Sequence, residues 1–297
     1  MIPKDNGMQG RIIKGVAGEY EVFTHDGVYV CKPKGIFRKN HIKPLIGDEV
    51  DIEILSSTDK TGIIGEIFER RNELIRPNVS NVDEALIVFA LSSPEPNFVT
   101  LDKMILQYRF QDIPVNICFN KDDLVSDDYI EKILSEYRDF GGRVLITSAR
   151  NCAGTDEVKA LLKGKTTTVA GPSGVGKSSL INCLCDREVS QVGDISEKLL
   201  RGKHTTRHSE ILPIDENTYI IDTPGFSSFD LFDIKAENAG DYYDEFKDCS
   251  ACRFMPCSHT HEPDCSVKAA VECGRISKMR YENYVHIYDD LIKARRY

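Results

Sequence analysis

The feature that most constrains the fold is a glycine-rich segment between an apolar run and a helical pattern. Residues 171–178 read Gly-Pro-Ser-Gly-Val-Gly-Lys-Ser and fit the spacing G-x-x-x-x-G-K-[ST]. The preceding run, Thr166–Ala170, is rich in β-branched residues, and Lys177–Leu184 has the pattern of a helix. A strand, a glycine-rich loop and a helix in this order predict a parallel α/β sheet at this point of the chain.

The same alternation extends in both directions. We expect further strands at Ala85–Leu91, Val115–Phe119, Val144–Thr147 and Thr218–Asp222, and helices at Leu101–Phe110, Tyr129–Phe140 and Asp156–Leu162. Upstream, five short β-rich runs separated by turn residues favour a small barrel of the OB type: Arg11–Lys14, Tyr20–Phe23, Val28–Cys31, Glu49–Ile54 and Ile63–Ile67. Downstream of about Ser228 the chain becomes acidic, aromatic and then rich in cysteine and histidine, and it ends in an amphipathic pattern over 277–295.

The glycine-rich segment has the residues of a phosphate-binding loop. Backbone N–H groups of such a loop surround phosphates, and the following helix presents its positive end. Lys177 would meet the charge of the β- and γ-phosphates and assist catalysis, and Ser178 would ligate Mg²⁺. The nucleotide phosphates are therefore expected to contact Gly171, Pro172, Ser173, Gly174, Val175, Gly176, Lys177, Ser178 and Ser179.

A second motif lies where the residues that bind Mg²⁺ and the γ-phosphate are expected. Asp222-Thr-Pro-Gly225 follows a β-run, so that Asp222 would hold Mg²⁺ through water and the Gly225 N–H would sense the γ-phosphate. Between the two motifs, residues 201–207 are polar and lack periodicity. We expect Thr206, next to Thr205, to close over Mg²⁺ and support catalysis; the alternative is an ordinary basic loop.

Two further motifs predict the choice of base. Asn120-Lys121-Asp122-Asp123 follows an apolar strand and has the form N-K-x-D. The carboxylate of Asp123 would accept hydrogen bonds from guanine N1 and N2, which adenine cannot supply. Thr147, Ser148 and Ala149 end the next strand and match the loop that reads the guanine carbonyl through backbone N–H. The pair favours GTP over the rival class, an ATP-using kinase or ATPase.

The order of these motifs is unusual. In ordinary GTPases the phosphate loop precedes the base-reading motifs, whereas here it follows them. Strand ends converge on one site wherever the covalent chain is cut, so a circularly permuted order remains compatible with one sheet. The segment after Gly225 then runs directly into the C-terminal region, which links the nucleotide state to that region.

Half of the ten cysteines lie between residues 249 and 273. In a reducing compartment such crowding favours a metal over disulfides. Six potential ligands exceed the four of a tetrahedral zinc, so spacing leaves the set open: Cys249, Cys252, Cys257, His259, His261 and Cys265. The alternatives are buried side chains without metal, or a redox pair Cys249 and Cys252, which lacks a thioredoxin-like setting.

Charge and hydropathy restrict the partners. A net charge of −9 argues against general affinity for nucleic acid, so any polyanion site must be local. Two basic runs qualify, although a solvated face is an equal alternative: Lys32, Lys34, Arg38, Lys39 and Lys43, and the group Arg275, Lys278, Arg280, Lys293, Arg295 and Arg296. No run approaches the roughly 18 apolar residues of a membrane span, and the first residues do not resemble a signal peptide, so we expect a cytoplasmic protein without a membrane partner.

These motifs together resemble the RsgA family, the bacterial GTPases that depend on the small ribosomal subunit, over essentially the whole chain. The resemblance is carried by Gly35–Lys39, Arg76-Pro77, Asn81–Asp83, Leu101-Asp102, Asn120–Asp123, Gly171–Ser179, Arg201–Arg207 and Asp222–Phe226. It implies an α/β protein: a circularly permuted P-loop GTPase domain (69–228) between an N-terminal OB-fold β-barrel that binds RNA (1–68) and a C-terminal zinc-binding, largely helical domain (229–297).

The resemblance also implies a function. The chain is expected to bind the small ribosomal subunit and its ribosomal RNA as a monomer, to act in late maturation, and to dissociate after subunit-stimulated hydrolysis of GTP to GDP. The alternative is a nucleotide-gated RNA-binding scaffold whose hydrolysis is incidental. For the zinc ion, the resemblance favours Cys252, Cys257, His259 and Cys265 as a closed structural site.

The catalytic group is expected in an unusual place. Phe226 stands where many GTPases carry a water-orienting glutamine, and a phenyl ring cannot orient water. The isolated chain should therefore hydrolyse GTP slowly, and a residue elsewhere should orient the water once the switch loop is ordered. His204, beside Thr205 and Thr206, is our catalytic candidate because an imidazole accepts a hydrogen bond from water near neutral pH. The alternative is that His204 contacts RNA or protein, or only supports the loop.

Overall fold

The structure is a computed structural model that describes residues 7–75, 77–185, 210–215, 217–222 and 234–294. The chain divides into two compact units, which are described separately. One unit comprises Met1–Asp83, Leu162–Val169 and Leu184–Pro224, and the other comprises Glu84–Leu161, Ala170–Cys183 and Gly225–Tyr297. Among the described residues no helix has the length and hydropathy needed to cross a membrane.

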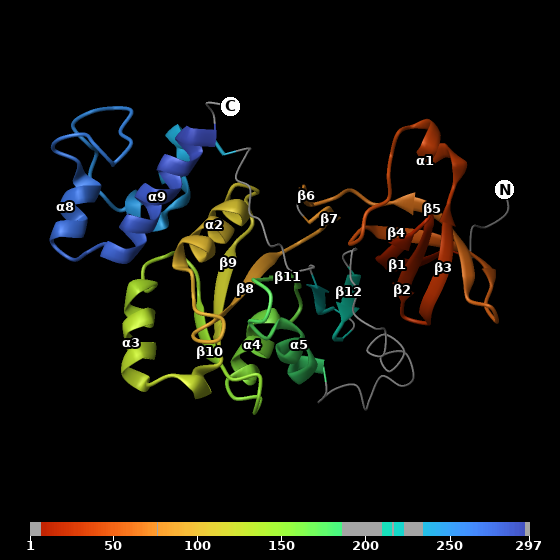
Figure 1. Cartoon of the computed structure of the whole chain (residues 1–297). Helices are drawn as coiled ribbons and strands as arrows, with labels where there is room; N and C mark the ends of the chain where they lie inside the picture. The colour runs from red at the N-terminus through yellow and green to blue at the C-terminus, as the bar shows by residue number, and fades with distance from the viewer. Residues whose placement is uncertain (1–6, 76, 186–209, 216, 223–233, 295–297) are drawn as a thin grey trace. The chain divides into compact units, whose positions relative to one another are not determined.

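The first unit contains a closed five-stranded barrel, drawn in red and orange in Figure 1. Its strands are β1 (Gly7–Val16), β2 (Glu19–Thr24), β3 (Gly27–Pro33), β4 (Glu49–Ser56) and β5 (Thr61–Ile67), in the order β1-β2-β3-β5-β4. Only the β3–β5 pairing among these strands is parallel. Alternate residues point inward and form an apolar core that includes Ile12, Val22, Tyr29, Val50, Ile52 and Ile64. The five predicted strands and the OB-like barrel are confirmed.

A buried carboxylate fixes the exit of the barrel. Asp48 is fully buried and accepts hydrogen bonds from Arg70 Nε at 2.7 Å, Ser80 Oγ at 2.6 Å and the Leu45 backbone N at 2.7 Å. Because an unpaired buried carboxylate is costly, these donors hold the connection that carries β6 (Glu73–Leu74) and β7 (Val79–Ser80) against the barrel. A short helix, α1 (Gly35–Lys39), follows β3 and was not predicted.

The strands of the α/β region have the order β10-β9-β8 in the second unit and β11-β13-β12 in the first. The three strands of the second unit, β8 (Glu84–Ala90), β9 (Val115–Asn120) and β10 (Val144–Thr147), are parallel. In the first unit β11 (Thr166–Ala170) pairs in parallel with β13 (Tyr219–Asp222), and β12 (Glu210–Pro213) pairs antiparallel with β13. Both β8 and β9 are buried along their whole length, which explains why most of their residues are apolar. The edge strand β12 was not predicted, because four residues ending in proline give no periodic signal.

The predicted helices of the α/β region are present. They are α2 (Phe98–Arg109), α3 (Asp127–Glu136), α4 (Thr155–Leu162) and α5 (Lys177–Cys185), with a 3₁₀ turn η1 (Asp122–Leu124) after β9. Helix α2 begins three residues before the predicted start, because the Asn97 side chain accepts a hydrogen bond from the Thr100 backbone N at 3.0 Å and caps the helix there.

The C-terminal region is largely helical, as predicted. It contains η2 (Ala236–Tyr242), α7 (Asp244–Lys247), α8 (Ser266–Glu272) and α9 (Lys278–Ala294), drawn in blue in Figure 1. These elements share one apolar core with Leu106 of α2, to which Tyr243, Phe246, Val267, Tyr284 and Ile287 contribute. Helix α9 therefore packs on the α/β part of the second unit.

A buried ion pair joins α9 to α2. Arg280 is 1% exposed and its guanidinium binds Asp102, which is fully buried, and Glu245, whose Oε1 accepts from Nε at 2.9 Å. Asp102 also accepts from Asn283 Nδ2 at 2.8 Å and Tyr137 OH at 3.0 Å. Although burial alone lowers the pKa of Arg280, the two carboxylates raise it well above its ordinary value, so the guanidinium stays charged.

Candidate functional site

The phosphate loop lies between β11 and α5. A Cβ on Gly171 would lie 2.1 Å from the carbonyl oxygen of Val88, so only glycine permits this approach of the loop to β8. Helix α5 begins at Lys177, which places Lys177, Ser178 and Ser179 in its first turn. The Lys177 ammonium donates to the carbonyl oxygens of Gly171 at 2.7 Å and Pro172 at 2.9 Å, so the loop holds the positive charge beside the helix N-terminus.

The first base-reading motif contacts this loop directly. Asn120 Nδ2 donates to the carbonyl oxygen of Val175 at 2.8 Å. A Cβ on Gly176, which has φ +98°, would lie 2.3 Å from that same amide nitrogen. Lys121 has a left-handed φ of 67°, and its ammonium donates to the Gly174 carbonyl at 2.7 Å. The structure therefore places Asn120 and Lys121 against the phosphate loop.

The second base-reading motif contacts the first. Asn120 Oδ1 accepts from the Ala149 backbone N at 2.8 Å and from Thr147 Oγ1 at 3.3 Å. Ser148 Oγ donates to Asp123 Oδ1 at 2.7 Å, which orients the carboxylate expected to face guanine. The amide of Asn120 thus connects three segments that are far apart in the chain. Segments connected in this way can present a carboxylate and backbone N–H groups to the same ligand.

Some predicted residues lie beyond this group. Ser173 lies in the loop itself and Asp122 begins η1. Asp222 is the last residue of β13 and pairs in register with Val169, which directly precedes Ala170 and the loop. The predicted switch residues His204, Thr205, Thr206, Gly225 and Phe226 lie outside the described residues.

One covalent feature of the site was not predicted. Cys152, in the loop after Ala149, forms a disulfide with Cys183 of α5, and their Cα atoms are 5.7 Å apart. The two cysteines are separated by 31 residues and belong to no spacing motif, so the sequence carried no signal for the pair.

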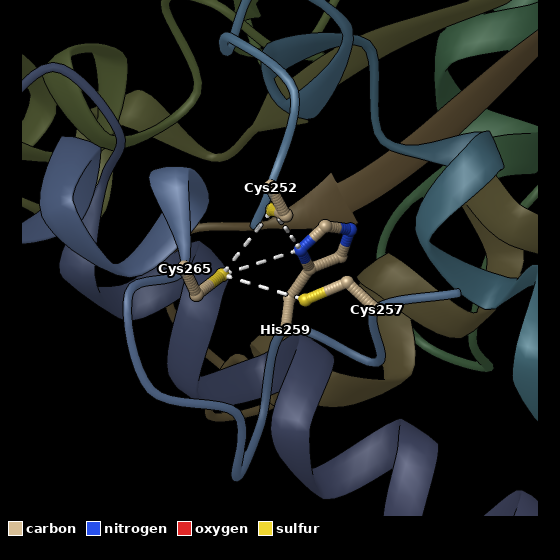
Figure 2. A group of neighbouring side chains, drawn as sticks. All are labelled: Cys252, Cys257, His259 and Cys265. Atoms are coloured by element: carbon tan, nitrogen blue, oxygen red, sulfur yellow. Dashed lines mark hydrogen bonds between the residues drawn. The ribbon is translucent and has the colours of Figure 1, made fainter. Parts of the chain in front are cut away.

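The C-terminal region contains a group of four convergent ligand atoms, shown in Figure 2. The three Sγ atoms of Cys252, Cys257 and Cys265 and a ring nitrogen of His259 all lie within 4.8 Å of one another. The Sγ atoms of Cys252 and Cys265 are 3.8 Å apart, and His259 Nδ1 lies 3.3 Å from Cys265 Sγ. A tetrahedral zinc with bonds of about 2.3 Å to sulfur separates its ligands by about 3.8 Å. The residues therefore fit zinc in size and chemistry.

The surroundings support a metal-binding conformation. Burial lowers the pKa of His259, which keeps its imidazole neutral as a ligand requires. Although burial acts to raise the pKa of Glu262, hydrogen bonds from Ser258 and Thr260 lower it to about 2. The charged Glu262 thereby fixes the turn that carries His259. Cys249 and His261, which spacing left open, lie outside the four-residue group.

The sheet and the connected motifs define the class of the protein: a P-loop GTPase whose base-reading motifs precede its phosphate loop. The sequence pattern of the RsgA GTPase matches residues 67–232, and that of the RsgA N-terminal domain matches residues 9–64. The chain belongs to the RsgA family of circularly permuted GTPases and hydrolyses GTP.

Known relatives are similar to this chain over nearly its full length. A protein of Agathobacter rectalis named small ribosomal subunit biogenesis GTPase RsgA is 49% identical, over 98% of this chain and all of its own. The protein of the same name from Alkaliphilus metalliredigens is 41% identical over 97% of this chain and 99% of its own. The crystal structure of YjeQ from Thermotoga maritima has a TM-score of 0.80 at 32% identity and covers 96% of this chain and 99% of its own. YloQ, described as a circularly permuted GTPase, has a TM-score of 0.79 at 34% identity and covers 99% and 98%.

Proposed function

We propose that the chain is a GTPase that acts in biogenesis of the small ribosomal subunit, where it binds the immature subunit and dissociates after GTP hydrolysis. The observation that carries the nucleotide part is the position of Asn120, whose amide contacts Val175 of the phosphate loop and Ala149 of the base-reading loop. The ribosomal part is supported by the names of full-length relatives. A role on ribosomal subunits would place the chain in the cytoplasm, and we retain a monomer as the expected form.

We infer that GTP is held from both ends. The phosphates would contact the backbone of residues 171–176 with Lys177, Ser178 and Ser179, and the base would contact Asp123 with the loop that begins at Thr147. Mg²⁺, which GTP hydrolysis generally requires, would be bound by Ser178 and Thr206, with Asp222 acting through water and Gly225 facing the γ-phosphate. Metal and lysine would balance the charge that develops on the phosphates.

Replacement of Asp123 by asparagine should weaken GTP and GDP binding by at least about tenfold, because a charge-assisted acceptor of two N–H groups becomes a neutral amide. Xanthosine triphosphate, which carries a carbonyl in place of the 2-amino group, should be favoured instead. Titration with fluorescent nucleotides measures both affinities. Asp127→Asn, in the exposed first turn of α3, is the matched control and should bind like the wild type. Equal affinity of both variants for GTP and GDP would show that Asp123 does not contact the base.

We infer that the group formed by Cys252, Cys257, His259 and Cys265 holds one structural zinc ion. Elemental analysis of protein purified without chelators should find about one zinc per chain, and Cys257→Ser or Cys265→Ser should reduce it to a small fraction. Cys249→Ser provides the matched control, since Cys249 packs against the same apolar core yet lies outside the ligand group. Zinc loss in Cys249→Ser equal to that in Cys257→Ser would contradict the ligand assignment.

We propose the division into an RNA-binding domain (1–68), a GTPase domain (69–228) and a zinc domain (229–297), with ribosomal RNA bound by the barrel. Two lysines of the barrel's basic run form exposed ion pairs, Lys34 with Glu53 and Lys32 with Glu19 at 3.2 Å. Arg38 and Lys39 occupy the last turn of α1. These two side chains are the better candidates for phosphate contacts. Lys32 and Lys34 would have to give up their ion pairs to bind RNA, so their contacts would add less binding free energy.

The decisive experiment compares GTP turnover with and without purified small subunits. If the small subunit is the partner, it should raise GTP turnover many-fold, and the chain should bind it less tightly with GDP than with GTP. A scaffold with incidental hydrolysis would bind small subunits without a change in turnover. Large subunits serve as the control. Absence of nucleotide-dependent binding to either subunit would contradict the proposed ribosomal role.

We further propose His204 as the water-positioning group, because Phe226 cannot orient water. His204→Ala should keep GTP affinity and subunit binding within about twofold yet lose at least about 100-fold of subunit-stimulated turnover, a typical contribution of a positioned general base. Single-turnover hydrolysis on saturating subunits measures this. If small subunits still stimulate His204→Ala as strongly as the wild type, His204 does not position the water, and the stimulating group must come from the ribosome.

A further inference from the structure

The disulfide between Cys152 and Cys183 connects the two halves of the proposed nucleotide site. Cys152 lies three residues after Ala149, whose N–H contacts the base-reading Asn120. Cys183 lies on α5, the helix that begins at the phosphate-binding Lys177. A Cα separation of 5.7 Å is at the common value for disulfides. The bond therefore joins the base-reading loop to the phosphate helix.

The loop that carries Cys152 is a tight turn with hydrogen bonds of its own. Ser148 N donates to the Ala153 carbonyl at 3.1 Å, and Thr155 Oγ1 donates to the Cys152 carbonyl at 2.8 Å. Cys152 itself has a left-handed φ of 57°. All of these contacts are internal to the turn, so they shape it without fixing it to α5.

Without the disulfide, Cys183 has another partner on the same loop. Its Sγ lies 3.3 Å from the Ala149 carbonyl oxygen, so the reduced thiol can donate a weak hydrogen bond there. Oxidation would replace this weak contact by a covalent bond to Cys152. Both states keep the loop against the helix, but only the oxidised state prevents separation.

We propose that Cys152 and Cys183 form a reversible thiol switch that slows nucleotide release, an inference that rests on the nucleotide site proposed above. Disulfides in reducing compartments are commonly transient and redox-sensing, which suits a pair beside a binding site. Ser148 of the base-reading loop donates to Asp123, so movement of this loop would also displace the carboxylate that is expected to face guanine. A loop linked to α5 opens less often, and bound GDP or GTP dissociates more slowly.

The oxidant is a low-molecular-weight disulfide of the glutathione type. Cys152 is partly exposed whereas Cys183 is 8% exposed, so Cys152 reacts first. Its thiolate attacks one sulfur of the small disulfide and forms a mixed disulfide, with release of one small thiolate. The Cys183 thiolate then attacks Cys152 Sγ and releases the second small thiol. The protein loses two protons and two electrons, and the small disulfide is reduced to two thiols.

The test uses the full chain with its zinc, treated with oxidised glutathione or with dithiothreitol. Peptide mass spectrometry should find the Cys152–Cys183 link only after oxidation. Dissociation of fluorescent GDP should be at least about fivefold slower in the oxidised protein, as expected when one loop is immobilised, and should recover on reduction. Cys152→Ser and Cys183→Ser should release at the reduced wild-type rate under both conditions. Cys273→Ser, which removes an exposed cysteine, should respond like the wild type.

Three results would overturn the switch. They are glutathione adducts or other pairings in place of the expected link, a linked protein that releases GDP at the reduced rate, and slowing that persists in the double variant Cys152→Ser/Cys183→Ser. Zinc content, measured in parallel, shows whether such slowing comes from the metal cysteines. GDP binding by the reduced protein tests the nucleotide site independently, so failure of the switch is distinguishable from failure of the proposed function.

Discussion

Lys177→Ala should lower the affinity for GTP at least about 100-fold and remove measurable hydrolysis. The ammonium lies at the start of α5 and donates to two loop carbonyls, which holds it where the β- and γ-phosphates would bind. A charge-assisted hydrogen bond contributes about 1.5–3 kcal/mol, and a lysine that meets two phosphates makes more than one. Titration with fluorescent GTP and phosphate release together measure the loss.

Two variants sharpen this prediction. Ser178→Ala should leave a residual affinity for GTP but lose most Mg²⁺-dependent turnover, because it removes a metal ligand and retains the lysine charge. Lys163→Ala removes an exposed lysine just after α4 and should behave like the wild type. Tight binding and normal turnover in both Lys177→Ala and Ser178→Ala would contradict the site.

Arg280→Met should destabilise the packing of α9 by about 3–5 kcal/mol. The substitution leaves Asp102 and Glu245 buried without their guanidinium, and an uncompensated buried charge carries a penalty of this size. Native-state hydrogen exchange of the α9 amides measures the local free energy of opening.

The matched control is the partly exposed pair between the same two helices, Lys103 with Asp290 at 2.7 Å. Lys103→Ala should cost at most about 1 kcal/mol, since water reaches both side chains and screens the ion pair. The double variant Asp102→Asn/Arg280→Met should recover part of the loss, because the unpaired charge is removed with its partner. An Arg280→Met protein with wild-type exchange would show that the buried pair does not hold α9.

The sequence predicted those parts of the fold that have a local period or a motif. Strands β8 and β9 are mostly apolar in sequence because they are buried on both faces. The edge strand β12 and helix α1 are too short to show a period, and they are formed by their tertiary surroundings. The motifs also predict which residues bind the nucleotide, which stays a prediction, but they did not predict that one amide, Asn120, connects three of these segments.

Long-range pairings are what the sequence could not show. Spacing alone left six possible zinc ligands; the family resemblance favoured four of them, and the structure brings the ligand atoms of these four within 4.8 Å of one another. In the sequence, Leu101-Asp102 carries only a family resemblance, whereas the structure shows Asp102 bound to Arg280, 178 positions later. The Cys152–Cys183 pair likewise depends on the packing of a loop against α5, which no pattern in either segment encodes.

The buried Arg280–Asp102 pair has a consequence for the timing of biosynthesis. Helix α9 follows every other described element along the chain, and at about 5–20 residues per second Arg280 is added roughly 9–36 s after Asp102. During that interval the carboxylate of Asp102 has no guanidinium to pair with, and α2 cannot complete its packing. The nascent GTPase region therefore reaches its final stability only after Arg280 has been added, so a polypeptide that stops before α9 is not a finished enzyme.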